Sequence, residues 1–208
     1  MSPVYERKDH YYKKAKEEGL ASRAVYKLEE IDKQFRLIPA AGKILDLGCA
    51  PGGWLQFLGK KVGTQGKVVG VDLLPVQAKF PPHVKVLRGD ATQPEIQEIC
   101  RKELDGPAHA VVSDMSPNLS GIRFRDNFES YQLALTVLKV ARSFLREGGS
   151  MLVKIFPGDE LNDYKKQLQE SFSEIKTFIP KATRKGSSEI YLIAKGFHLA
   201  KAAAFKPA

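Results

Sequence analysis

The chain has 208 residues, 43% of them hydrophobic and 27% charged, a balance typical of a folded globular protein rather than a disordered one. This length suits one sizeable domain and is short for two. No apolar run approaches the roughly 18 residues of a membrane span, and the polar segment from Met1 to Lys16 does not resemble a signal peptide. We therefore expect a single-domain, monomeric protein located in the cytoplasm.

Charge and cysteine usage narrow the class of partner. The net charge is +9, and the excess is greatest over 176–208, with seven bases against one acid, while 1–43 holds ten bases against seven acids. Such an excess suits a polyanionic partner, and equally a solubilising surface. Cys49 and Cys100 belong to no CxxC or Cys/His cluster, so we expect neither a disulfide framework nor a bound metal.

The predicted elements begin with a helix over 22–36, for which Ser22 is the expected cap. After Gly42, short apolar runs alternate with helical stretches. Several of these runs are apolar on both faces, as in a parallel sheet covered by helices on both sides. The predicted strands are 43–48, 67–73, 84–88, 109–114, 150–156, 174–179 and 189–195, and the further helices are 53–62, 94–104, 127–147 and 160–172.

The order of these elements predicts an α/β, Rossmann-like fold. Its seven-stranded sheet is mostly parallel, with helices on both faces, and the short connection from Pro180 to Ser188 makes the last strand antiparallel. We expect a basic helical extension over 1–42, the Rossmann-like core over 43–197, and a basic, frayed tail over 198–208.

Three acidic residues follow three successive predicted strands. Asp46 precedes a Gly-rich turn, where a carboxylate can attract an ammonium or a sulfonium, and the turn lacks the GxGxxG of a dinucleotide site. Asp72 closes the second strand and can accept both hydroxyls of a ribose, while Asp90 can accept an adenine amino group. Each acid alone also fits a helix cap. Together they indicate S-adenosylmethionine; Trp54 beside the turn fits either the pocket or the core.

Four further polar residues occupy unusual positions. Lys154 lies inside the apolar run MLVKIF, where a charge is costly unless paired or neutral, although a snorkelling lysine is the alternative. Asp114 ends the neighbouring strand, where a turn-forming Asp is also common. Lys27 lies close to the apolar stripe of its helix, and Glu189 opens the final strand. Taken alone, the last two read as an exposed lysine and a strand-end charge.

With these residues in view, the chain resembles the FtsJ/RrmJ (RlmE) family of RNA ribose 2′-O-methyltransferases from about Asp9 to Phe197. The motifs that carry the resemblance are SRAVYKLEEID, LDLGCAPGGW, GVDLLP, RGDAT, SDMSPN, LVKIF and SSEIYLIAKGF, in that order. Two residues depart from the family pattern: Cys49 replaces a small residue, usually alanine, and Leu55 replaces a frequent serine. Neither departure removes a proposed catalytic group.

The resemblance implies S-adenosylmethionine as methyl donor, S-adenosylhomocysteine as product, and no metal. The family's catalytic tetrad falls on Lys27, Asp114, Lys154 and Glu189. The expected cofactor-binding residues are Asp46, Gly48, Pro51, Gly52, Gly53, Trp54, Asp72, Leu73, Asp90, Ala91 and Asp114.

The predicted reaction is an in-line transfer of the methyl group to a ribose 2′-hydroxyl. A lysine acts as base only when its pKa falls toward neutrality, and partial burial and a second ammonium both lower it. We assign Lys154 as base, Lys27 as the second cation, Asp114 as the group that orients Lys154, and Glu189 as the group that holds Lys27 or the ribose. Arg123, Arg125, helix 22–36 and the basic C-terminal region are expected to follow RNA phosphates.

The compact length and the GGW turn favour a uridine in the A-loop of 23S ribosomal RNA, within the large ribosomal subunit, as the target. The alternatives are a tRNA anticodon-loop 2′-O-methyltransferase of the same family, an mRNA cap enzyme, a non-catalytic RNA-binding protein on this fold, and a small-molecule methyltransferase. Sequence order leaves open which of the two lysines faces the hydroxyl.

Overall fold

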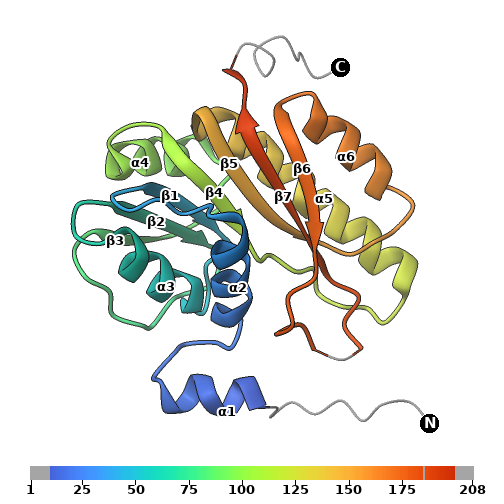
Figure 1. Ribbon diagram of the computed structural model, residues 1–208, viewed down its shortest axis with the longest axis horizontal. Helices are drawn as coiled ribbons and strands as arrows, with labels where there is room; N and C mark the ends of the chain where they lie inside the picture. Colours follow the sequence, from blue (N-terminus) through green and yellow to red (C-terminus); the bar gives the residue numbers. More distant parts are fainter. Residues whose placement is uncertain (1–9, 185, 200–208) are drawn as a thin grey trace.

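A computed structural model describes residues 10–184 and 186–199. Within them, one sheet has the strand order β3-β2-β1-β4-β5-β7-β6 (Figure 1). β7 runs antiparallel to both of its neighbours, and the other six strands are parallel to one another, as predicted. The strands are β1 (Lys43–Leu47), β2 (Lys67–Asp72), β3 (Val84–Arg88), β4 (Ala108–Ser113), β5 (Leu145–Ile155), β6 (Phe172–Phe178) and β7 (Ile190–Phe197).

Helices cover both faces of the sheet. Apolar residues of α2 and α3 pack on one face with β-strand residues such as Ile44 and Val112, while α4, α5 and α6 pack on the other with residues such as Leu45 and Val111. This alternation of neighbouring residues between two cores is the period of a β-strand covered on both sides. The helices are α1 (His10–Glu17), α2 (Val25–Phe35), α3 (Gly53–Val62), α4 (Pro94–Leu104), α5 (Arg123–Phe144) and α6 (Leu161–Gln169).

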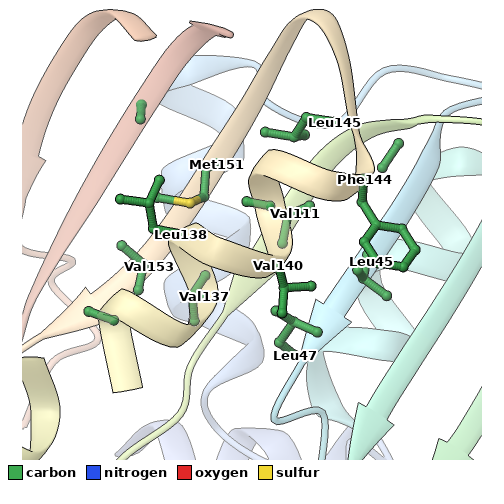
Figure 2. Close-up of a cluster of buried hydrophobic side chains, with 14 of the residues drawn as sticks. Leu45, Leu47, Val111, Val137, Leu138, Val140, Phe144, Leu145, Met151 and Val153 are labelled. Atoms are coloured by element: carbon green, nitrogen blue, oxygen red, sulfur yellow. The ribbon is translucent and has the colours of Figure 1, made fainter. Parts of the chain in front are cut away.

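The core beneath α5 fixes the central strands. Figure 2 shows Val137, Val140 and Phe144 on the sheet-facing side of α5, with Val140 beside Leu47 and Phe144 beside Leu45 of β1. All five side chains are buried, so their apolar surface contributes to folding at about 25 cal/mol per Å² removed from water. The central strands β1, β4 and β5 therefore form a rigid support for the residues at their carboxyl ends.

Several predicted boundaries were wrong, and two of the differences have clear physical reasons. α2 begins at Val25, and Ser22 does not cap it, because Ser22 packs against Gly53 at the start of α3. α5 ends at Phe144 rather than at 147, because buried Leu145 pairs with Ala108 and starts β5 five residues earlier than predicted.

Smaller differences concern the ends of other elements. Asp114 lies just after β4 and Glu189 just before β7, and α1 is an addition to the predicted elements. The expected frayed end of the tail, Lys201 to Ala208, lies outside the described residues. No helix in the described part of the chain is both long and apolar enough to cross a membrane.

Candidate active site

The proposed catalytic residues meet at the carboxyl end of the parallel strands. Lys154 lies near the end of β5 and Asp114 directly after β4, and these strands are hydrogen-bonded neighbours. Lys27 is contributed by α2, and Glu189 by the connection from β6 to β7. Figure 1 shows α2, the β6–β7 connection and the start of α5 at this same end of the sheet.

Lys154 is held by the residue that follows the neighbouring strand. Its Nζ donates to the Asp114 carbonyl oxygen at 2.6 Å and lies 3.1 Å from Asp114 Oδ1. Lys154 is only 7% exposed, so its charge is compensated by a partner rather than by water. Burial opposes ionisation of Asp114, yet the Lys154 and Lys27 ammoniums and the Tyr191 hydroxyl together hold the pKa of this carboxyl below its usual range.

Lys27 and Glu189 form a second ion pair. Nζ of Lys27 lies 2.5 Å from Glu189 Oε1, although the groups are not aligned as a hydrogen bond, and both side chains are 11% exposed. The Lys27 ammonium also lies 5.7 Å from the centre of the Tyr191 ring. Because Lys27 lowers the pKa of Asp114, the two ion pairs act on each other electrostatically. The structure thus brings all four side chains into one site.

Tyr191 belongs to this site and was missed from the sequence. It is fully buried, and its hydroxyl donates to Asp114 Oδ1 at 2.6 Å. Burial, reinforced by the Asp114 and Glu189 carboxylates, raises the pKa of Tyr191 well above its ordinary value, so the hydroxyl remains a donor. The available signal was its spacing: Tyr191 follows Glu189 by two residues, which places both on one side of a strand. That spacing alone does not distinguish it from a core tyrosine.

Asp46 lies within electrostatic reach of Asp114 and of Asp72. Asp46 of β1 is 1% exposed, and neither of its oxygens has a hydrogen-bond partner within the described residues. Burial raises the pKa of Asp46 well above its usual value, and the negative charges of Asp114 and Asp72 raise it further. A buried carboxyl without a donor is costly unless a ligand supplies one. This position therefore fits a cationic ligand.

Asp72 and Asp90 already organise the turns that follow their strands. Asp72 Oδ2 accepts the Ala50 N–H at 2.8 Å and Oδ1 accepts the Leu74 N–H at 2.8 Å. Asp90 Oδ1 accepts both the backbone N–H and the hydroxyl of Thr92, each at 2.8 Å. A carboxylate oxygen has two lone pairs, so both acids can also accept hydrogen bonds from a ligand. Both the turn-forming role and the expected ligand role are thus compatible with this geometry.

The Gly-rich turn after β1 leaves little room for side chains. Gly48 has φ +76° and Gly52 has φ +110°, a backbone region that favours glycine. A Cβ on Gly48 would overlap the Met115 side chain, and one on Gly52 would lie 2.9 Å from Phe80 Cζ. Pro51 follows a cis peptide bond in the same turn. These glycines let the Met115 side chain, after β4, and the Phe80 side chain, after β2, lie close against the turn.

The remaining expected cofactor residues differ in setting. Trp54 is 4% exposed, donates its indole N–H to the Ala24 carbonyl at 2.9 Å, and lies 6.3 Å from the Tyr191 ring, so it packs in the core between α2 and β7. Gly53 begins α3 and packs against Ser22. Leu73 is 66% exposed after β2, and Ala91 is half-buried. Among the described residues, no group of three or more His, Cys, Asp or Glu side chains could hold a metal ion.

The sheet topology, together with the polar residues at the carboxyl ends of the strands, identifies the class of the protein as a Rossmann-like methyltransferase fold. A solved structure of a putative ribosomal RNA methyltransferase from Plasmodium falciparum aligns with a TM-score of 0.74 and 27% identity, over 85% of this chain and 98% of that one. Fibrillarin from Aeropyrum pernix, solved with S-adenosyl-L-methionine bound, shares the fold at a TM-score of 0.56 and 20% identity, over 82% of this chain and 75% of that one.

The sequence profile of the FtsJ-like methyltransferases matches residues 20–197. Two relatives named ribosomal RNA large subunit methyltransferase E are each 44% identical over 91% of this chain. The protein from Syntrophobacter fumaroxidans is covered over 95% of its length, and that from Methanothrix thermoacetophila over 73%. The chain belongs to the FtsJ-like methyltransferase family.

Proposed function

We propose that this protein transfers the methyl group of S-adenosylmethionine to a ribose 2′-hydroxyl of RNA, at a uridine in the A-loop of large-subunit ribosomal RNA. One observation carries the proposal: two buried lysine–carboxylate pairs meet around Asp114, next to the Asp46 carboxyl, whose oxygens have no hydrogen-bond partner within the described residues. The names of the relatives support ribosomal RNA of the large subunit as the substrate.

Asp46, Asp72, Asp90 and the turn over 48–54 would hold the methyl donor. S-adenosylmethionine supplies a sulfonium-bound methyl group that is already activated for displacement. The buried Asp46 carboxyl would receive the positive charge of this ligand, because its oxygens have no hydrogen-bond partner within the described residues and the Asp114 and Asp72 carboxylates make its surroundings negative. Asp72 and Asp90 would accept the ribose hydroxyls and the adenine amino group with their unused lone pairs.

Lys154 acts as the general base in this proposal. A neutral amine has two N–H donors and one lone pair. Both donors have acceptors on Asp114, its carbonyl oxygen and its Oδ1, so the lone pair is left for the ribose. The proton passes from the 2′-hydroxyl to Nζ as the 2′-oxygen takes the methyl group, and it leaves later to water. The ionised Asp114 balances the ammonium that forms.

Lys27 stabilises the negative charge that develops on the 2′-oxygen. Its ammonium is fixed in place by Glu189 and by the face of Tyr191, so it needs little rearrangement when the charge appears. Lys27 and Lys154 both lower the pKa of Asp114, which supports the assignment of the two ammoniums to one electrostatically coupled site.

The RNA would cross the carboxyl end of the sheet. Arg123 and Arg125 at the start of α5 are exposed there and would contact phosphates, although Arg125 also pairs with Glu129 at 2.8 Å. Lys195, which was expected to contribute to the basic surface, has a different role. Its Nζ donates to the Phe35 carbonyl oxygen at 3.1 Å and ties β7 to α2.

The test is transfer of labelled methyl groups from S-adenosylmethionine to three RNA substrates: naked large-subunit ribosomal RNA, intact large subunits, and tRNA. The proposal predicts label in large-subunit RNA in at least one of its two forms. Label in tRNA alone would make this an anticodon-loop enzyme. Binding of RNA without any transfer would make it a non-catalytic protein on this fold.

A further inference from the structure

The loop and first turn after β4 expose an unusual number of large apolar side chains. Leu119 is 67% exposed, Ile122 62%, Phe124 69% and Phe128 44%. A folded protein rarely exposes several such side chains close together unless a partner covers them. We call these four residues the α5 entry patch.

Phe124 and Phe128 do not contribute to the side of α5 that packs on the sheet. Asp126, Ser130 and Ala134 form the buried stripe of the helix. Phe124 and Phe128 are each two positions from Asp126, and this spacing places them on the opposite side of the helix. They are four residues apart and so lie next to each other on that side. The exposure of Phe124 and Phe128 therefore follows from their positions around the helix.

The loop that carries the patch is held in a defined conformation. Asp126 Oδ1 accepts the backbone N–H of Ser120 at 2.8 Å and its hydroxyl at 2.7 Å, while Oδ2 accepts the Gly121 N–H at 3.2 Å. The Ser120 hydroxyl oxygen in turn accepts the Ile122 N–H at 3.1 Å. The hydrogen bonds from Ser120 and Gly121 lower the pKa of Asp126. A partner would meet a preorganised surface, which reduces the entropic cost of binding.

The patch adjoins the carboxyl end of the sheet, where the proposed catalytic residues lie. Leu119 follows Asp114 by five residues, so the Cα atoms of the two residues lie at most about 18 Å apart. Exposed Arg123 and Arg125 lie between its apolar residues in the sequence. The Asn127 side-chain amide donates to the Pro157 carbonyl at 3.0 Å and links the patch to the chain just after β5, the strand of Lys154.

We propose that the α5 entry patch receives unpaired nucleobases next to the methylated ribose, with Phe124 as the principal stacking residue. This inference rests on the proposed function and deepens it. Aromatic side chains stack on any base, and neighbouring arginines hold the phosphates, a combination typical of single-stranded RNA binding. A protein surface or a second copy of this chain would explain the apolar residues. Neither would explain Arg123 and Arg125 between them, beside the proposed catalytic residues.

The test compares Phe124→Ala, Phe124→Trp and the wild type. Ile99→Ala is the matched control, since Ile99 is an exposed apolar residue of α4, away from the patch. Fluorescence anisotropy without the methyl donor measures affinity for a uridine-rich single-stranded oligonucleotide and for a duplex of equal length. We expect Phe124→Ala to weaken single-strand binding about tenfold and duplex binding little, because stacking needs an open base. Phe124→Trp and Ile99→Ala should bind like the wild type.

Methyl transfer to large-subunit ribosomal RNA supplies the second readout. Phe124→Ala should raise KM about tenfold with kcat and S-adenosylmethionine affinity unchanged. If the wild type methylates RNA and Phe124→Ala has the same single-strand affinity and KM as the wild type, the proposed role of the patch is refuted and the proposed function stands. If Phe124→Ala binds single strands more weakly and the wild type methylates no RNA, the role of the patch is supported and the proposed function is refuted. Self-association of the wild type that Phe124→Ala abolishes, with RNA affinity unchanged, would assign the patch to a second copy.

Discussion

The two ion pairs of the site use the same chemical groups but are built in different ways. Lys154 and Asp114 come from adjacent strands, whose register pairs Val153 with Ser113, so the sheet itself sets their separation. Lys27 and Glu189 come from an N-terminal helix and a late connection. Their meeting depends on tertiary contacts such as the bond from Lys195 to Phe35. The first pair should thus be separable from the second in its effect on chemistry and on stability.

The largest effect is expected for Lys154→Ala. Loss of a general base slows methyl transfer by about 10²–10⁴-fold, and the sheet should still fold because Asp114 keeps its Tyr191 donor. Single-turnover transfer and S-adenosylmethionine binding by calorimetry measure the two consequences separately. Lys43→Ala, which also removes a strand lysine whose Nζ donates to a carbonyl oxygen, that of Asp105, is the control and should retain activity. Unchanged transfer in Lys154→Ala would refute the assignment of the base.

Lys27→Ala should reduce transfer less, by about 10²-fold, because it removes charge stabilisation but leaves the base. It should also destabilise the protein by about 3 kcal/mol, since Glu189 would remain as a nearly buried, unpaired charge. Chemical denaturation and transfer rates check both values. The double variant Lys27→Met with Glu189→Leu should regain stability but not activity. If the double variant regained activity as well, Lys27 would have only a structural role.

Asp46→Asn should weaken S-adenosylmethionine binding about tenfold through loss of one charge interaction. The pKa of Asp46 is higher in the folded protein than in the unfolded chain, so ionisation as pH rises lowers the stability of the ligand-free protein. The Asn variant should lack this decline.

Thermal unfolding across a pH series, with calorimetry in buffers of different ionisation enthalpy, tests the Asp46 prediction. Wild-type binding should release a proton as the cationic ligand favours the charged carboxylate, and Asp46→Asn should release less. Asp32→Asn is the matched control: Asp32 is 2% exposed but is paired with Lys61, so its loss should cost stability without changing ligand affinity. Equal proton release by wild type and Asp46→Asn would contradict this account of the pocket.

The smallest effect is expected for Tyr191→Phe, which removes one hydrogen bond and keeps the ring. Transfer should fall less than tenfold, and the acid limb of its pH profile should shift to higher pH. The Tyr191 hydroxyl lowers the pKa of Asp114, so its removal lets Asp114 protonate at a higher pH. Tyr164→Phe, which removes a buried hydroxyl bound to the Ala134 carbonyl, should leave the profile in place. An unshifted profile in Tyr191→Phe would remove this residue from the site.

The sheet could be predicted from sequence because apolar runs and connection lengths are local signals. The helices over 53–62 and 94–104 were predicted at their observed ends, and the reversed last strand followed from the short connection before it. The carboxyl-end rule also indicated which edge would collect Asp46, Asp114 and Lys154. These parts of the fold depend on residues close together in the chain.

The missed features depend on tertiary contacts. Ser22 matches a helix cap in sequence, but in the fold it packs against Gly53 of α3. The role of Tyr191 becomes visible only in the folded chain, where its hydroxyl donates to Asp114. The same holds for Asp46, whose oxygens have no hydrogen-bond partner among the described residues. Sequence patterns report neither which polar groups meet nor which remain without partners.

The most direct test of the central claim is the chemical position of the methyl group. Large-subunit RNA methylated with labelled S-adenosylmethionine is hydrolysed with alkali, which cleaves next to a free 2′-hydroxyl but not next to a methylated one. This account predicts label in alkali-resistant dinucleotides from the wild type, and a rate of labelling at least about 100-fold lower from Lys154→Ala. Label recovered in single nucleotides would place the methyl group on a base and contradict ribose methylation.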